Sequence, residues 1–312
     1  MTCDNITSTR CARAFSPGHI TGFFEKPNKN LYDNYLSYGS TGSGFSISKG
    51  VTTYVEISKN NTKQYDVYIN KDSIKNARVS NWVAEYFLSK IDYPVHIKIE
   101  HNVDIPIGFG LGTSGAAALS LSFALNSALD LKLSKESIGQ IAHLSEIYCN
   151  TGLGTVLAEF YGGIEIRTKS GAPGIGKVIK IPTNEYKAII FCIAPLYTKN
   201  MLTKSLYESN HLCRKMINKL VETKNVNDFL QMSYTFSNSL NLINDKCQDI
   251  IKKLNSLGLQ GSIALFGETI FTLTDISNVN KIRSLLQDHR GRLIICDIDS
   301  NGANLINSYP VY

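Results

Sequence analysis

The chain has 312 residues, enough for one large or two ordinary domains, and its apolar content of 43% excludes a disordered protein. The net charge of +6 is modest, and since no basic run carries interleaved aromatic residues, we expect no nucleic-acid partner. The seven cysteines are scattered without a C-x-x-C pair, which argues against a disulfide framework or a zinc site and favours a cytoplasmic protein with reduced thiols.

The first half of the chain predicts strands and helices in mixed order. Residues 1–12 are polar, and we expect them to form a disordered N-terminus. Apolar residues recur at every second position in the expected strands and at helical spacing in the expected helices. In chain order we expect a strand and turn (14–24), a glycine-rich turn (39–44), a strand (45–57), a helix (80–91), a strand (95–99), a long helix (ending near 130), a helix capped by Ser134 and Ser137, and a strand (162–167).

The second half predicts a similar mixture. Residues 188–196 form the longest apolar stretch, which is much shorter than the roughly 20 residues of a membrane helix, so we expect a buried strand at 187–194 and no membrane partner. The further elements are two or three helices between 199 and 256, a strand pair or a strand–loop–helix at 258–273, a helix (278–287), and a terminal hairpin (293–306) that turns at Asn301-Gly302. Strands and helices do not alternate strictly, so we predict an α+β fold, with domains at 13–168 and 169–312.

A glycine-rich loop between the strand at 95–99 and the long helix is the strongest functional signal. Backbone N–H groups at a helix start have no intrahelical partner, and the helix dipole adds about half a positive charge there, which suits a polyphosphate. Gly108, Gly110 and Gly112 allow the backbone to approach a phosphate closely. Thr113 and Ser114 offer hydroxyls to a phosphate or to Mg²⁺. The alternative is a strand-to-helix turn that only needs glycines and a helix cap.

Other segments also combine glycines with polar residues. In residues 14–24 a Ser-Pro-Gly turn precedes His19, which is either a buried packing histidine or a contact for an anionic ligand. Residues 39–51 are rich in glycine and serine and, taken alone, predict a flexible loop. Residues 258–269 are compatible with a core strand that contains a bulge glycine.

These segments resemble the motifs of the GHMP kinases. Residues 106–115 are similar to the second motif of that family, P-x-x-x-G-L-G-[ST]-S-A. Residues 14–24 resemble its N-terminal motif, with His19 where a lysine is usual, and residues 258–269 resemble its third motif. The sequence His-Ile-Thr-Gly-Phe-Phe and residues 39–51 look like the archaeal pantoate kinase branch. The resemblance implies the two-domain GHMP kinase fold, with a ribosomal protein S5 domain 2-like N-terminal domain and an α/β-sandwich C-terminal domain.

The resemblance also implies an activity and a site. Pantoate kinases transfer the γ-phosphate of ATP, with Mg²⁺, to the primary hydroxyl of pantoate, and the product 4-phosphopantoate serves coenzyme A synthesis. The residues implied for Mg²⁺ are Ser114 and Glu146. The residues implied for pantoate are His19, Ser40, Ser43 and Arg167, with His19 also near the transferred phosphate. The residues implied for ATP are Pro106, Gly108, Gly110, Leu111, Gly112, Thr113, Ser114 and Gly115.

One residue of the family pattern is absent. The catalytic aspartate of the family falls at Thr155, and Glu159, one helical turn later on the same face, is the candidate to replace it. Three hypotheses stay open. The chain is a pantoate kinase, with or without a general base, a GHMP kinase for another small hydroxy acid such as mevalonate or homoserine, or a catalytically silent nucleotide-binding paralogue. A homodimer is compatible with each of them.

Overall fold

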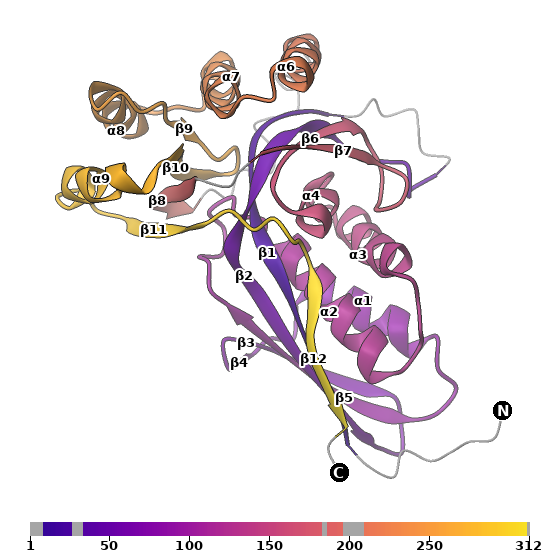
Figure 1. Cartoon of the computed structure of the whole chain (residues 1–312). Helices are drawn as coiled ribbons and strands as arrows, with labels where there is room; N and C mark the ends of the chain where they lie inside the picture. Colours follow the sequence, from indigo (N-terminus) through magenta and orange to yellow (C-terminus); the bar gives the residue numbers. More distant parts are fainter. Residues whose placement is uncertain (1–8, 27–33, 183–185, 196–208, 311–312) are drawn as a thin grey trace.

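The structure, a computed structural model, describes residues 9–26, 34–182, 186–195 and 209–310, and within them two β-sheets with packed helices (Figure 1). The strands of the larger sheet are β1 (Arg10–Glu25), β2 (Thr41–Lys59), β3 (Gln64–Ile69), β4 (Asp72–Ser73), β5 (Val95–Val103), β6 (Ile164–Lys169), β7 (Lys177–Ile181) and β12 (Asn304–Pro310). The strands of the smaller sheet are β8 (Lys187–Pro195), β9 (Ser262–Ile263), β10 (Gly267–Thr274) and β11 (Arg292–Asp297). The helices are α1 (Arg78–Leu88), α2 (Thr113–Ala128), α3 (Lys135–Cys149), α4 (Thr155–Tyr161), α6 (Asn210–Thr223), α7 (Val226–Ser239), α8 (Asp245–Ser256) and α9 (Val279–Leu286), with a 3₁₀ turn at Ile276–Asn278.

The larger sheet is built around the long strand β2. Its main path runs β12-β1-β2-β5-β3-β4, and β6 and β7 extend it from the start of β2. β2 pairs with β6 through its first residues and with β5 through its last ones. β3 runs parallel to β5, and the other described pairs are antiparallel. The smaller sheet has the order β11-β8-β10-β9, and the mixed architecture confirms the expected α+β fold.

Helices α1 to α4 cover one face of the larger sheet (Figure 1). Along β5, the buried residues Val95, Ile97 and Ile99 alternate with more exposed ones, which confirms the predicted period of two. α2 lies against β1 and β2 and also contacts α1, α3 and α4. Eleven of its 16 residues are buried and none is exposed, as expected for a helix enclosed in a core. The start of α2 is therefore held rigidly on several sides.

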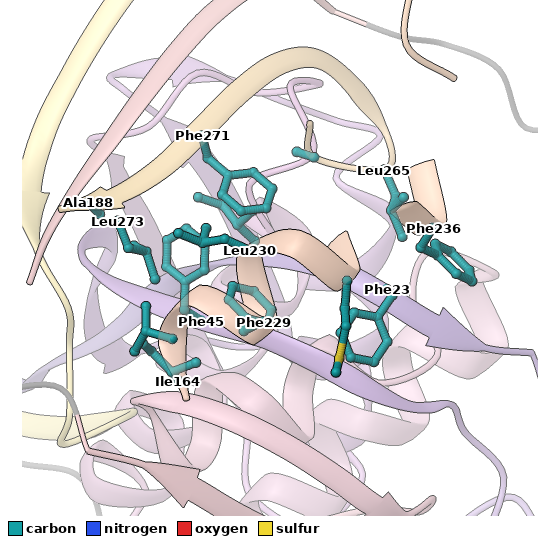
Figure 2. Packing of buried hydrophobic residues seen from close by; sticks show 14 of the residues in the cluster. Phe23, Phe45, Ile164, Ala188, Phe229, Leu230, Phe236, Leu265, Phe271 and Leu273 are labelled. Carbon is teal, nitrogen blue, oxygen red and sulfur yellow. The ribbon is translucent and has the colours of Figure 1, made fainter. Parts of the chain in front are cut away.

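A cluster of phenylalanines joins the two sheets (Figure 2). The ring centroid of Phe229 in α7 lies 6.3 Å from that of Phe23 in β1 and 6.1 Å from that of Phe45 in β2. Phe271 of β10 lies 6.3 Å from Phe229 and 5.3 Å from Phe45. All four rings are fully buried, so one apolar core continues from the larger sheet through α7 into the smaller sheet.

We expect Phe229→Ala to lower the free energy of unfolding by about 3–5 kcal/mol, because it removes a buried ring that contacts both sheets. Denaturant unfolding curves measure the change. Ile276→Ala is the control, since the Ile276 side chain is 66% exposed and its loss should change the free energy by less than about 0.5 kcal/mol. Similar effects of the two substitutions would mean that the cluster does not hold the sheets together.

The expected terminal hairpin at 293–306 is wrong. β11 pairs with β8 in the smaller sheet, whereas β12 pairs with β1 in the larger sheet. Between them, the Asp299 carboxylate accepts hydrogen bonds from the backbone N–H groups of Asn301 and Gly302. The N–H of Ala303 then donates to the carbonyl of Glu159 in α4. The turn at Asn301-Gly302 therefore carries the chain from one sheet to the other, because contacts with α4 outweigh the local preference for a hairpin.

Two features of the structure bear on the ends of the predicted domains. β1 begins at Arg10, so disorder is wrong for residues 10–12, whose backbone pairs with both β2 and β12. Residues 1–8 lie outside the described residues. β7 and β12 follow the predicted boundary at 168/169 but belong to the larger sheet, so the chain crosses between the sheets more than once. The boundary itself stays a prediction.

The six cysteines within the described ranges are free thiols. No helix of the described residues combines the length and the hydropathy that a membrane span requires.

Candidate active site

The glycine loop has the predicted conformation. It connects the end of β5 at Val103 with the start of α2 at Thr113. Gly108, Gly110 and Gly112 have φ values of +88°, +74° and +72°, a left-handed region in which glycine has no steric cost. Pro106 lies partly buried at the beginning of the loop. The strand–loop–helix order inferred from the sequence is confirmed.

The start of α2 is suited to bind an anion. Within the described residues no side chain caps this helix, so the N–H groups of its first turn stay available. The helix dipole adds positive potential at the same place. The side chain of Leu111 is buried in the core, and its carbonyl accepts a 3.0 Å hydrogen bond from the N–H of His19. Leu111 therefore holds the loop against β1.

Residues 258–269, which resemble the third motif of the family, pack against the same glycine loop. The Thr269 hydroxyl donates a 2.9 Å hydrogen bond to the carbonyl of Phe109. A Cβ atom at Gly267 would lie 2.5 Å from the same carbonyl oxygen, and one at Gly110 would lie 3.1 Å from the backbone of Phe266. The β9–β10 turn and the glycine loop are thus packed backbone to backbone. Of the two alternatives for residues 258–273, the strand pair is the one formed.

Glu146 lies buried at the C-terminal end of α3 and faces the start of α2. Its carboxylate accepts a 2.6 Å hydrogen bond from the Thr151 hydroxyl. Burial raises the pKa of Glu146 above its ordinary value, and the neighbouring Thr151 and Ser114 hydroxyls lower it in part. The interpretation of Glu146 as a solvated carboxylate is therefore wrong, because the helix face that carries it is covered. The structure brings Glu146 and Ser114 together, as the resemblance implied.

Thr155 and Glu159 lie on the same side of α4, beside the glycine loop. A Cβ atom at Gly112 would lie 3.0 Å from the Thr155 methyl group and would collide with the Glu159 carboxylate, and one at Gly115 would lie 2.6 Å from Glu159 Oε2. Thr155 is partly exposed, whereas Glu159 is fully buried. Neither carboxylate oxygen of Glu159 has a hydrogen-bond partner in the described part of the chain. Gly112 and Gly115 therefore leave the room that Glu159 occupies beneath the loop.

Burial raises the pKa of Glu159 well above its ordinary value of 4.5, and the nearby Glu146 and Glu165 carboxylates raise it further. The folded protein thus binds the proton of the Glu159 carboxyl group more tightly than the unfolded chain does. The stability that the protonated Glu159 contributes is present below the ordinary pKa and is lost as the pH rises toward the pKa of the folded state.

We expect Glu159→Gln to remove part of this pH dependence, so that the melting temperature falls less between about pH 5 and pH 8 than in the wild type. Thermal unfolding without nucleotide or Mg²⁺ measures the melting temperature at each pH. Glu136→Gln, an exposed change in α3, should keep the wild-type profile. Parallel profiles for all three proteins would contradict the raised pKa.

The structure also reveals a buried carboxylate that the sequence analysis missed. Glu165 of β6 accepts a hydrogen bond from Arg167 of the same strand, and its Oε1 lies 3.1 Å from His19 Nε2 in β1. Ile164 and Ile166 alternate with the two charged residues, a pattern typical of a strand with one solvent face. The pattern therefore does not indicate the burial of Glu165. His19 is buried, and its imidazole contacts the polar side chains of Glu165 and Thr21.

The glycine-rich segment at 39–44 is not a loop in the structure. Residues from Thr41 onward belong to β2, so a turn there is wrong, because β1 and β6 pair with this segment on both sides. The Ser43 hydroxyl donates a 2.6 Å hydrogen bond to the carbonyl of Glu165, which ties β2 to β6. The N–H of Ser40 donates to the carbonyl of Leu153, which brings Ser40 to the turn before α4.

Comparison with known proteins agrees with this geometry. Residues 77–163 match the family model described as the GHMP kinases N terminal domain, a segment that contains the glycine loop, Glu146 and Glu159. The pantoate kinase of Methanocaldococcus jannaschii is 31% identical over 91% of this chain and 99% of its own length. The chain belongs to the GHMP kinase family.

Further relatives of this GHMP kinase extend the comparison. The homoserine kinase of Saccharolobus solfataricus is 30% identical over 66% of this chain and 65% of its own length. A solved structure described as a phosphotransferase related to the CoA biosynthesis pathway has a TM-score of 0.86 and 26% identity, covering 95% of this chain and 98% of that one. These similarities confirm the family and the two-domain fold. His19, Ser40 and Arg167 of the kinase lie outside the residues that the family model matches.

Proposed function

We propose that the chain is an ATP-dependent kinase that phosphorylates the primary hydroxyl of pantoate to 4-phosphopantoate, a step in coenzyme A biosynthesis. The observation that carries the proposal is the uncapped start of α2, which meets the buried Glu146 on one side and the segment with His19 on the other. Phosphoryl transfer depends mainly on positioning and on neutralising charge, and this arrangement supplies both. The near full-length similarity to a pantoate kinase supports the choice of acceptor.

ATP phosphates would lie against residues 108–115. Gly108, Gly110 and Gly112 give the backbone its open curve, and the N–H groups of the first turn of α2 donate to phosphate oxygens. The Thr113 and Ser114 side chains are partly exposed at the same place. Gly115 serves packing, because it leaves room for Glu159.

The residues near the start of α2 fit Mg²⁺. Glu146 and Ser114 offer hard oxygen atoms, and the buried Glu146 carboxylate forms no ion pair within the described residues. The described residues contain no group of three or more His, Cys, Asp or Glu that could hold a metal ion. In kinases Mg²⁺ uses few protein ligands and several phosphate oxygens, and it neutralises the phosphates when bound.

We expect Glu146→Gln to shift the Mg²⁺ titration of activity to higher concentration, since a neutral amide is a weaker ligand for a hard cation than a carboxylate. Titrations at saturating ATP measure the half-maximal Mg²⁺ concentration. Glu136→Gln, an exposed change on the same helix, is the matched control. An unshifted curve for Glu146→Gln would remove this residue from the metal site.

The acceptor would lie near His19, Ser40 and Arg167. The Arg167 guanidinium is a fixed cation beside this place, as required for a carboxylate ligand. Ser43 stays a candidate contact, although its hydroxyl already donates to β6.

The deciding experiment is coupled ADP release with pantoate, pantothenate, mevalonate and homoserine side by side. Pantoate should give the highest kcat/KM. Preference for homoserine would favour the second function, which the 30% identity to a homoserine kinase supports. ATP binding without turnover of any acceptor would favour a silent paralogue, which Thr155 supports. A cytoplasmic location and a homodimer stay predictions, and sedimentation tests the latter.

A further inference from the structure

Three polar side chains form a buried cluster beside the proposed acceptor site. His19 and Arg167 are each 1% exposed, and Glu165 is fully buried. Glu165 Oε1 contacts both of the others, since it pairs with the Arg167 guanidinium and lies 3.1 Å from His19 Nε2. A guanidinium in a protein interior is costly unless it is paired. The Glu165 carboxylate therefore compensates the buried charge of Arg167.

The glycines of β2 make this cluster possible. β2 lies between β1, which carries His19, and β6, which carries Glu165. Gly44 pairs directly with Glu165 in the β2–β6 register, and a Cβ atom at Gly44 would lie 2.5 Å from His19 Nε2. The imidazole thus crosses β2 through the space that a side chain at residue 44 would fill. This explains a glycine-rich sequence in a strand, where glycine is otherwise unfavourable.

The cluster has one donor and one acceptor, Arg167 Nε and Glu165 Oε2, without a hydrogen-bond partner among the described residues. Arg167 Nε is buried and lies 3.2 Å from the position that a Cβ atom of Gly154 would take, and the Ser40 hydroxyl borders the same space. A guanidinium N–H and a hydroxyl that lie beside the same glycine are suited to bind one small anionic group together, such as a carboxylate.

We propose that Glu165 is the positioning residue of the acceptor site, whose carboxylate fixes the Arg167 guanidinium so that its Nε serves one small carboxylate ligand. The inference rests on the proposed function, because that ligand is the acceptor. Glu165 itself does not touch the acceptor. It holds Arg167 in one orientation through Nη1 and leaves Nε without a partner beside Gly154 and Ser40, while His19 Nε2 lies beside the same carboxylate oxygen. Without the Glu165 carboxylate, the Arg167 guanidinium stays charged but is no longer held in one orientation.

The test compares steady-state kinetics of Glu165→Gln with the wild type, varying pantoate and ATP separately. The glutamine keeps the shape and one acceptor oxygen but removes the charge that orients Arg167. We expect kcat/KM for pantoate to fall by about 10²-fold, as for a misplaced substrate-positioning group, with KM for ATP unchanged. Glu165→Asp retains the charge at shorter reach and should restore part of the loss. Glu100→Gln breaks an exposed ion pair with Lys98 in β5 and should change neither KM.

Three outcomes would overturn the inference. Equal losses for pantoate and ATP, or a lower melting temperature with unchanged kinetics, would leave Glu165 with a packing role only. Loss of folding in both Glu165→Gln and Glu165→Asp would also leave Glu165 with a packing role only. A failure of the proposed function can be told apart from these outcomes, because the wild type would then not use pantoate. In that case the same comparison is made on the acceptor that the wild type does use, and an unchanged KM for it overturns the inference.

Discussion

Replacement of Gly108 by alanine should weaken Mg-ATP binding about 10- to 100-fold, because the loss of one charge-assisted hydrogen bond to a phosphate costs about 1.5–3 kcal/mol. Gly108 is the cleanest of the three loop glycines for this test. A Cβ atom there would meet only the side chain of Pro195, at 3.3 Å, whereas one at Gly112 would collide with Glu159 and one at Gly110 would press on Phe266. Calorimetry with a non-hydrolysable ATP analogue measures the affinity.

Gly258→Ala is the matched control for this prediction. Gly258 has a φ of +74°, close to the +88° of Gly108, so alanine meets the same backbone strain at both positions. No described atom lies within 4 Å of a Cβ at Gly258, so packing is undisturbed. Both variants should lose similar stability, and only Gly108→Ala should lose affinity for ATP. Equal ATP affinity of the two variants would exclude Gly108 from the nucleotide site.

Substitution of Thr155 by aspartate should raise kcat by about 10²-fold, the lower end of what a general base contributes. Thr155 is partly exposed beside the glycine loop, so a carboxylate there can reach the acceptor hydroxyl. Glu159 is fully buried beneath the loop, and its raised pKa favours the neutral acid, which is a poor proton acceptor. We therefore expect a wild-type enzyme that works mainly by positioning. Pantoate-dependent ADP release measures kcat.

Two further variants decide between the hypotheses for this position. Thr155→Asn has the shape of the aspartate without its charge and should not raise kcat. Glu159→Gln resembles the neutral acid and should change kcat little. A loss on the order of 10²-fold in Glu159→Gln would instead assign the proton transfer to Glu159. A wild type without kinase activity that gains it through Thr155→Asp would identify a silenced paralogue.

Local chemistry explains what could be predicted from the sequence. The glycine loop and the start of α2 depend on residues next to each other in the chain, because positive φ values require glycine and a helix start follows from its own first turn. The alternation in β5 and the Ser134 cap of α3, which accepts from the N–H of Ser137, are local in the same sense. The motifs that resemble the GHMP kinases are short and continuous, so they identified the family.

Contacts between distant segments account for what was missed. Glu165 is separated from His19 by 146 residues, and only the pairing of β1, β2 and β6 brings their side chains together. The strand pattern of Ile164 and Ile166 predicts one solvent face, but neighbouring elements cover both faces of β6.

The turn at Asn301-Gly302 also shows that a local pattern does not decide which sheet a strand joins. Asn301-Gly302 has the local chemistry of a hairpin, yet β11 and β12 join different sheets, because α4 and β1 provide contacts that a hairpin lacks. The sequence by itself therefore determined most of the helices and strands, the family and the phosphate-type loop, all of which depend on near neighbours in the chain. The tertiary structure decided which charged side chains are buried together, since burial and ion pairing depend on elements that the chain brings together only when it folds.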